Sequence, residues 1–475
     1  MEINVSKKDV IWSYFAQFFN IGAGIIVLPL ILHMLSTEEI ALNYLMLTIG
    51  SMVALIDFGF APQFGRNITY VFSGAQDLKK QGLSESTGNE INYHLLKNLI
   101  DVAKRVYFYM SITVLAIMLT LGTIYIYYVT DGFKTVHNTL LVWAVYSVST
   151  YFNIYFYYYS SLLTGRGLIK ESKKAMMLQR IVYIVLAYVL LLSDYGLLGV
   201  CIANLIAPFV NRWLCHHYFY DTKLNGILSN EKSDSKELKK LFSVIWYNAK
   251  KLGINFLGAY AITQFSMFIA GIYLSPNDVS SYGLMMQLVS ILAGVSTALF
   301  ATNVPKISSL RINNDREGVV KIFAFAMNCY YALFVLGSAM IILVGPPALR
   351  FIGSNATLPT NVVLITFLII MLLENNHSNF ATYITTGNDV PFVKAALISG
   401  FLICIGDVMV LHFTEFGLIG IVLVQGLVQL AYNNWYWPKY VLKELNINYF
   451  TFIAKGIVEF SNVIRTKEKK MYGKH

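Results

Sequence analysis

The chain has 475 residues, of which 56% are hydrophobic and only 13% are charged. A soluble globular protein would carry about 25% charged residues, so a soluble fold is excluded. The net charge of +10 could suit nucleic acid in a soluble protein, but here it arises from cations in the loops between apolar segments, and no nucleic-acid partner is expected.

Twelve apolar segments follow one another along the chain, and each can cross a hydrocarbon core of about 30 Å as a helix. We predict an all-α polytopic membrane protein whose spans lie near residues 9–34, 40–64, 106–129, 139–163, 175–193, 196–216, 252–275, 278–303, 320–344, 359–384, 391–412 and 416–438. The first segment is too long for a signal peptide and lacks a small-residue cleavage site, so we expect it to be retained.

The cations lie almost entirely on one side of these spans. Of the 36 Lys and Arg residues, 31 fall at the termini and in the loops of one side, whereas the opposite loops hold only Lys134 and Arg350. The positive-inside rule then places both termini in the cytoplasm. Trp435, Tyr436 and Trp437, at the end of the last span, fit an aromatic belt at the inner interface.

The chain divides into two similar halves. "VIW" at 10–12 recurs at 244–246, and "LSTEEIALNY" (35–44) resembles "LSPNDVSSY" (274–282). We predict an N-terminal six-helix bundle (1–220), a charged linker (221–243), a C-terminal six-helix bundle (244–440) and a cytoplasmic tail (441–475) with an amphipathic interfacial helix. Six spans per half give both halves one orientation, so a pseudo-two-fold axis along the membrane normal would relate them, and substrate would bind between them.

The stretch "MLLENNHSNF" (371–380) places Glu374 and His377 three residues apart in the tenth span. A charge at mid-bilayer costs about 2.5–3.5 kcal/mol, so such residues face a cavity or polar partners. Asp57 and Asp407 are also acids within spans. These four residues are our candidates for cavity lining and for coupling to protons or sodium; a buried network that only fixes helix packing is the alternative.

Four cations near the cytoplasmic ends of spans are candidates for holding an anionic headgroup: Arg66, Arg180, Lys250 and Lys251. A cavity open to the cytoplasm would present this positive charge to an incoming anion. The alternative for Arg66 and the two lysines is that they extend to the lipid headgroups.

The fourth span carries tyrosines at helical spacing, Tyr151, Tyr155, Tyr158 and Tyr159. A stripe of flat rings with hydroxyl groups suits contact with sugars, and the alternative is an aromatic packing stripe or interface belt.

Sequence signatures of catalysis, metal binding and cofactor binding do not emerge. The sequence contains no Walker A motif, no H-E-x-x-H and no G-x-S-x-G. The four cysteines lack metal-ligand spacing. We therefore predict a protein that is not an enzyme.

Three segments together resemble a known family: "VIWSYFAQFFNIGAGIIVLPLIL", "LSTEEIALNYLML" and "LIDFGFAPQFGRNITY". They resemble the polysaccharide-transport branch of the multidrug/oligosaccharidyl-lipid/polysaccharide exporter superfamily, and within it the Wzx-type O-antigen flippases. The D-F-G-x-x-x-x-x-x-R arrangement, with Asp57 and Arg66 at its ends, is the most family-like feature.

The resemblance implies a flippase of the bacterial inner membrane. It would move undecaprenyl-diphosphate-linked O-antigen repeat units from the cytoplasmic to the periplasmic leaflet by alternating access, beside an O-antigen polymerase and a chain-length regulator. The alternative is a cation-coupled drug antiporter of the same superfamily, although the first span holds no acid beyond Asp9 at its edge. A membrane glycan polymerase or ligase ranks third, because the external loops are short.

Overall fold

The computed structural model describes residues 7–57, 59–80, 90–387 and 390–472. Within these ranges, most side chains before residue 26 and those at 54, at 312, at 462–472 and at most positions of 251–259 lie outside the description. The described residues are almost entirely helical and form no strand, so the predicted all-α class is confirmed.

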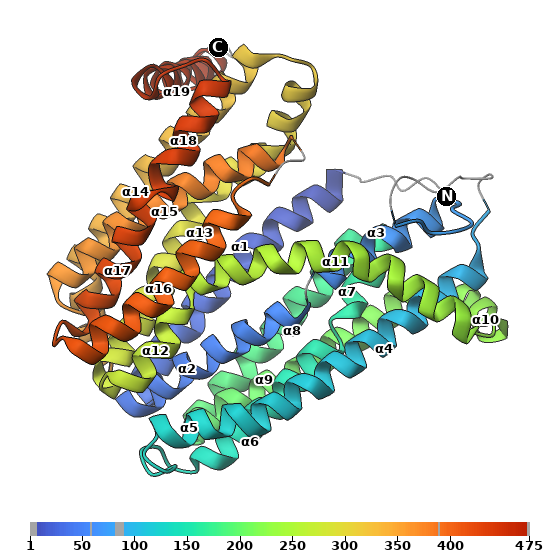
Figure 1. Ribbon diagram of the computed structural model, residues 1–475, viewed down its shortest axis with the longest axis horizontal. Helices are drawn as coiled ribbons and strands as arrows, with labels where there is room; N and C mark the ends of the chain where they lie inside the picture. Colours follow the sequence, from blue (N-terminus) through green and yellow to red (C-terminus); the bar gives the residue numbers. More distant parts are fainter. Residues whose placement is uncertain (1–6, 58, 81–89, 388–389, 473–475) are drawn as a thin grey trace. The chain divides into compact units, whose positions relative to one another are not determined.

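Contacts within the chain define two compact units, 1–260 with 353–355, and 261–352 with 356–475 (Figure 1). The predicted bundle and linker boundaries stay a prediction. The first unit contains α1 (Lys7–Met34), α2 (Thr37–Ala54), η1 (Leu55–Asp57), α3 (Phe60–Phe72), α4 (Tyr93–Ile117), the π-helical turn η2 (Met118–Gly122), α5 (Thr123–Val129), α6 (Thr139–Tyr155), α7 (Tyr158–Gly165), α8 (Ile169–Leu192), α9 (Gly196–Phe219), α10 (Thr222–Asn230) and all but the end of α11 (Ser235–Thr263).

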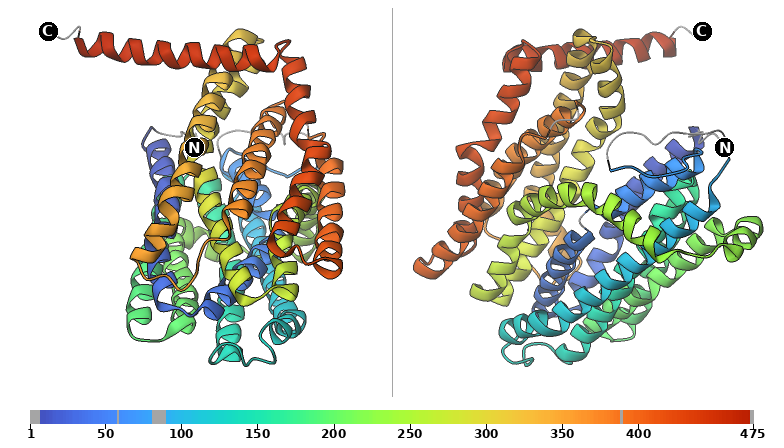
Figure 2. Two further views of the ribbon diagram at one scale, coloured as in Figure 1. Left: turned by 90° about the vertical axis from the view of Figure 1, so that its left-hand side faces the viewer. Right: turned by 45° about the vertical axis from the view of Figure 1, so that its right-hand side comes forward.

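The second unit contains α12 (Phe265–Tyr273), α13 (Pro276–Ile312), α14 (Arg316–Phe351), α15 (Asn361–Thr385), α16 (Val393–Phe413), α17 (Gly417–Ala431), α18 (Asn433–Glu444) and α19 (Tyr449–Tyr472). Figure 2 shows α19 lying across the end of α14.

Nine helical stretches among the described residues are long and apolar enough to cross a membrane. They correspond to nine of the twelve predicted spans, and the count of twelve stays a prediction. The other three are the first span, where most side chains lie outside the description, and the fourth and seventh. The fourth is divided into α6 and α7 at residues 156–157, and the seventh into α11 and α12 at Gln264.

The two segments paired by sequence similarity begin helices with the same capping chemistry. Ser36 accepts the backbone N–H of Glu39 at 3.2 Å, and the Glu39 carboxylate accepts that of Ser36 at 3.0 Å. Ser275 accepts the backbone N–H of Asp278 at 3.2 Å and donates its hydroxyl to the Asp278 carboxylate at 2.7 Å. In both cases a serine satisfies a free donor of the first helical turn.

Helices α3 and α7 of the first unit pack with their backbones close together. The Thr69 hydroxyl donates to the carbonyl of Gly165 at 3.1 Å, and the Ser161 hydroxyl donates to that of Ala61 at 3.0 Å. A Cβ atom added to Gly165 would lie 2.6 Å from the Ile68 Cβ. Glycine at this position is therefore what permits the approach.

In the second unit, aromatic rings hold the tail against the bundle. Phe323 of α14 lies 5.2 Å from the Phe452 ring of α19 and 5.3 Å from the Tyr383 ring of α15, measured between ring centroids. Phe452 is fully buried, whereas Ile457 and Phe460 remain exposed. The tail is helical as predicted, and its position at a membrane interface stays a prediction.

Candidate functional site

The polar stretch of α15 lies at the centre of a network in the second unit. Glu374 and His377 come together on one face, with 3.9 Å between Glu374 Oε1 and His377 Nε2. His377 Nδ1 lies 2.8 Å from Asn434 Oδ1 of α18. Since an amide oxygen only accepts, this contact places a proton on Nδ1. His377 Nε2 then faces Glu374.

The network is buried and incompletely satisfied. Among the described residues, Glu374 Oε2, Asn379 Nδ2 and Asn434 Nδ2 have no hydrogen-bond partner. A buried polar atom left without a partner costs about 1–3 kcal/mol. The arrangement therefore has vacant donors and acceptors that a proton, an ion or a polar substrate group could satisfy.

A separate set of polar contacts joins α15 to the tail. Asn376 Oδ1 accepts the hydroxyl of Tyr331 at 2.6 Å, and the oxygens of Tyr331 and Tyr449 lie 2.7 Å apart. Tyr331 belongs to α14 and Tyr449 opens α19. Asn376 of α15 is thus connected through Tyr331 to the start of the tail helix.

Asp407 of α16 forms a separate buried site. Its side chain is fully buried, and neither carboxylate oxygen has a hydrogen-bond partner in the described part of the chain. Ser266 of α12 and Tyr282 of α13 interact electrostatically with this carboxylate. An uncompensated carboxylate is strongly unfavourable in such an environment, and the coupling role of Asp407 stays a prediction.

The first unit places Asp57 in a structural position. Asp57 Oδ1 accepts the hydroxyl of buried Tyr107, and Oδ2 accepts the backbone N–H of Ala61 at 3.3 Å. Gly59 follows with a φ of 75°, which favours glycine. Phe58, the middle residue of the motif, lies outside the described residues. Asp57 thus fixes the start of α3 against α4, and its coupling role stays a prediction.

The four predicted headgroup cations do not form a described cluster. Arg66 is exposed on α3 and donates to the Gln63 side chain, and Arg180 is exposed on α8. The Lys250 ammonium lies 5.7 Å from the Tyr247 ring, and the Lys251 side chain lies outside the described residues. No hydrogen bond or ion pair joins the described members, so a shared anion site stays a prediction.

The four tyrosines of the predicted stripe form a run of ring contacts across α6 and α7. Tyr151 and Tyr155 stack at the end of α6 with centroids 6.0 Å apart, whereas Tyr158 and Tyr159 stack at 4.4 Å at the start of α7. The rings of Tyr155 and Tyr158 lie 6.5 Å apart in an edge contact, so the stripe expected from helical spacing is present, with Tyr158 and Tyr159 buried in the hydrophobic core. It crosses the short break between α6 and α7, where the Tyr157 N–H donates to the carbonyl of Ile154. Sugar contact stays a prediction.

A small cavity of about 200 Å³ lies beside residues 156–157. Its lining includes Asn153, Ser160, Gln179 and Asn211 from four helices. These four side chains contribute amide and hydroxyl groups to the cavity lining.

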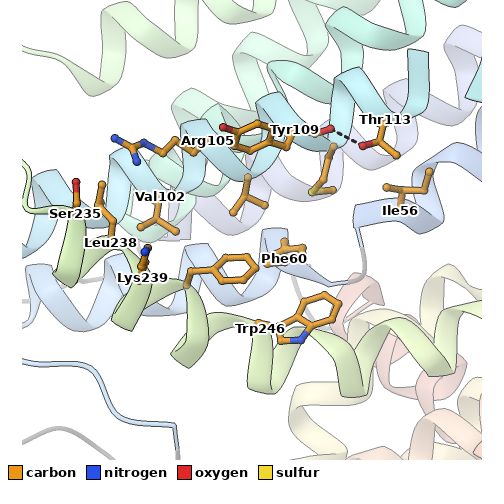
Figure 3. Close-up of a pocket in the computed structure, with 13 residues that line it drawn as sticks. Ile56, Phe60, Val102, Arg105, Tyr109, Thr113, Ser235, Leu238, Lys239 and Trp246 are labelled. Atoms are coloured by element: carbon orange, nitrogen blue, oxygen red, sulfur yellow. Dashed lines mark hydrogen bonds between the residues drawn. The ribbon is translucent and has the colours of Figure 1, made fainter. Parts of the chain in front are cut away.

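A larger cavity of about 800 Å³ lies between α3, α4 and α11 (Figure 3). Its walls are mainly apolar, and Arg105 and Lys239 lie at its rim. Sequence reasoning missed this site because it treated both cations only as loop charges.

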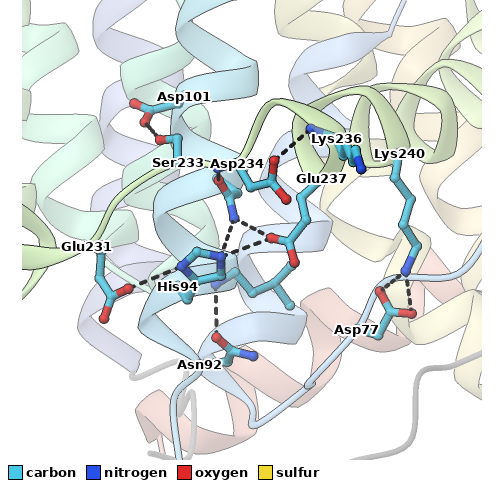
Figure 4. Close-up of polar contacts among 12 residues, drawn as sticks. Asp77, Asn92, His94, Asp101, Glu231, Ser233, Asp234, Lys236, Glu237 and Lys240 are labelled. Atoms are coloured by element: carbon cyan, nitrogen blue, oxygen red, sulfur yellow. Dashed lines mark hydrogen bonds and ion pairs between the residues drawn. The ribbon is translucent and has the colours of Figure 1, made fainter.

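Polar contacts hold the start of α11 to α4 (Figure 4). His94 Nδ1 lies 3.2 Å from Glu231 Oε2, and its Nε2 lies 3.1 Å from Glu237 Oε2. Asn98 donates to Glu237, and the Asp234 backbone N–H donates to Asn98 at 3.2 Å. The charged segment near 230–240, which the sequence predicted as a linker, is therefore held to α4 by these contacts.

Lys240 extends these contacts to the loop after α3. Its ammonium lies 3.0 Å from both carboxylate oxygens of Asp77. Partial burial raises the pKa of Asp77, but the hydrogen bond and charge of Lys240 outweigh this and lower it overall.

Solved structures show what fold these sites belong to. No family model and no curated protein matches the sequence. The structure is similar to an inward-facing multidrug resistance MATE family transporter of the MOP superfamily, with a TM-score of 0.62, 16% identity, and coverage of 91% of this chain and 95% of that chain. It is also similar to the lipid II flippase MurJ in an inward closed conformation, with a TM-score of 0.63, 14% identity, and coverage of 96% and 91%.

An outward-facing MATE family transporter gives a TM-score of 0.53 at 14% identity, over 94% of this chain and 96% of that chain. The chain therefore has the fold of MOP-superfamily transporters. The resemblance read from the sequence is confirmed at the level of the fold. The O-antigen branch belongs to the proposal.

Two groups of site residues escaped sequence reasoning. Asn434 faces His377, and its signal was the polar pair Asn433–Asn434 directly before the aromatic belt. Ser266 and Tyr282 beside Asp407 gave no signal, because a single serine or tyrosine in a span is unremarkable until helices α12, α13 and α16 meet.

Proposed function

We propose that the chain is an ion-coupled flippase that moves a polyprenyl-diphosphate-linked oligosaccharide, an O-antigen repeat unit, across the bacterial inner membrane by alternating access. The observation that carries this proposal is the set of carboxylates buried in apolar helices of a transporter fold, Glu374 and Asp407. Ionisable groups at such depth mark ion or substrate pathways.

The fold supports a flippase by analogy, since one similar structure is a lipid II flippase. The family resemblance around Asp57 and Arg66 supports an oligosaccharide substrate. Glu374 with His377 would bind a proton, and Asp407 would bind a proton or sodium. Each binding event would remove an uncompensated buried charge and so stabilise one conformation over the other.

A cation-coupled drug antiporter is the second candidate. The same buried acids would serve it, and MATE family transporters share the fold. The first predicted span holds no acid beyond Asp9, which favours the flippase.

The test uses cells that lack this gene and the terminal O-antigen ligase, in which the leaflet holding the lipid-linked repeat unit is measured. We expect the unit on the cytoplasmic leaflet, and its transfer outward when the intact gene is restored. E374Q and D407N should lower the transfer rate about tenfold or more, since each removes one titrating group while keeping its shape.

The matched controls are E415Q and D194N, which make the same changes at exposed turns and should transfer at the normal rate. Normal export without the gene would overturn the flippase. If the gene instead lowers the accumulation of cationic dyes, the antiporter replaces it. Full activity of both E374Q and D407N would leave these acids with a packing role and remove the proposed coupling.

A further inference from the structure

The 800 Å³ cavity of the first unit has an aromatic wall. The Phe60 ring lies 5.7 Å from the Trp246 ring and 6.3 Å from the Phe242 ring, with interplanar angles of 27° and 22°. Val102 and Val106 of α4 complete an apolar lining. A surface of this kind binds hydrocarbon, because polar ligands would lose their hydration without new partners.

One end of the cavity is cationic. Figure 3 places Arg105, Lys239 and Ser235 toward one end, with Ile56 and Thr113 toward the other. Both cations are exposed. Among the described residues neither has an ion pair, whereas the adjacent Lys104 and Lys240 pair with acids at 3.8 and 3.0 Å.

The order along α4 gives the cavity a direction relative to the bilayer. Arg105 is the last charged residue before Asp131, and the intervening residues are apolar or uncharged. The cavity therefore runs from the polar beginning of α4 into the part of the helix that can span a membrane. In a bilayer its cationic end would lie near the headgroups, because the residues that follow Arg105 along α4 are uncharged.

We propose that this cavity binds an anionic glycerophospholipid, with one acyl chain along the aromatic wall and the phosphate paired with Arg105 and Lys239. Basic pockets between membrane helices recognise anionic headgroups in this way. A cationic drug would be repelled by the two charges, and a neutral lipid would leave them unpaired. This inference concerns a lipid of the surrounding bilayer and does not depend on the proposed transport activity.

The polar groups of the lining also argue against a sugar ligand. The Thr113 hydroxyl is already donated to the carbonyl of Tyr109 at 2.9 Å, which leaves Ser235 as the one other hydroxyl of an aliphatic side chain at the cavity. A saccharide requires many directed hydrogen bonds, whereas a phosphate requires charge. The lining supplies charge.

The experiment measures lipid binding to the purified full-length chain in a neutral detergent by native mass spectrometry. The probes are phosphatidylglycerol, phosphatidylcholine and undecaprenyl phosphate. We expect phosphatidylglycerol to bind at least tenfold more tightly than phosphatidylcholine. R105A/K239A should weaken it at least tenfold, whereas K232A/K236A, which removes two exposed lysines of the same region outside the lining, should change binding less than twofold.

T113W tests the apolar part separately. Thr113 is exposed at the far end of the lining, so tryptophan can be accommodated there without disturbing the core, and its ring would occupy the space of the acyl chain. We expect normal elution in size-exclusion chromatography with at least fivefold weaker phosphatidylglycerol binding.

Three results would overturn the inference. Equal losses in R105A/K239A and K232A/K236A would show diffuse surface attraction. Equal binding of phosphatidylcholine would show that the cations take no part. Displacement of phosphatidylglycerol by undecaprenyl phosphate at equal or lower concentration would assign the cavity to a carried lipid instead. None of these results bears on whether the chain is a flippase, because no transport is measured.

Discussion

Replacing Gly165 by alanine tests the close packing of α3 on α7. An added Cβ would lie 2.6 Å from the Ile68 Cβ and 2.7 Å from the carbonyl oxygen of Gly65. Both atoms belong to or adjoin the backbone, so no side-chain rotation can relieve the contact. One helix has to move away from the other.

Two opposing terms set the change in the free energy of unfolding caused by G165A. Alanine is favoured over glycine in a helix by up to about 1 kcal/mol, while overpacking of a well-packed core costs about 1–3 kcal/mol. Because the contact is with backbone, we take the upper half of that range, and G165A should destabilise the chain by about 1–2 kcal/mol. The midpoint of thermal unfolding should fall by about 2–8 °C, using about 2–4 °C per kcal/mol for a unit of this size.

Gly226 of α10 provides the matched control. A Cβ there meets nothing within 4 Å, so G226A should raise stability by about 0.4–1 kcal/mol. The assay is thermal unfolding of the purified full chain in detergent, for both variants at one heating rate. A G165A variant that melts at or above the wild-type temperature, with G226A raised as expected, would refute the close approach of α3 and α7.

Two further predictions concern the side of the chain rich in Lys and Arg. The hydrogen bond from Arg166 lowers the pKa of Asp221. The ionised Asp221 therefore contributes to the free energy of unfolding above its unfolded pKa of about 3.9, and this contribution is lost as the pH falls through the folded pKa. D221N, which can still cap a helix, should therefore lower the melting temperature slightly at pH 7, and by less as the pH falls below the unfolded pKa; a difference that does not shrink at acid pH would contradict this. H94A should release the segment 231–237 and raise tryptic cleavage at exposed Lys232 several-fold in limited proteolysis, and unchanged cleavage would show that His94 does not hold it.

Some of the site was predictable because spacing along a helix is local. Glu374 and His377 are three residues apart, and any α-helix brings such residues onto one face, as the structure shows. The tyrosine stripe rested on the same rule, and the rings of Tyr155 and Tyr158 lie 6.5 Å apart although α6 ends at the first and α7 begins at the second. Helical spacing predicted these neighbours, whereas the burial of Tyr158 and Tyr159 depends on the other elements that pack against them.

Basic residues of the candidate sites were harder to identify from the sequence than acidic ones. A buried carboxylate in an apolar segment is conspicuous, since its cost there is large. Lysine and arginine are abundant at membrane boundaries, where each can extend to the headgroups. Sequence reasoning therefore selected Arg180 and Lys250, which have no described role in a shared site, and passed over Arg105 and Lys239, which border a cavity.

The sequence alone determined the solvent, the helical class and the presence of misplaced polar residues, because transfer of each residue into hydrocarbon depends on composition over a short window. The tertiary structure decided which of those residues meet. Asp407 gains Ser266 and Tyr282 as neighbours, His377 gains Asn434, and the cavity forms where α3, α4 and α11 converge. These contacts join residues about 50 to 190 positions apart in the chain, and only the packing of helices against one another brings such residues together.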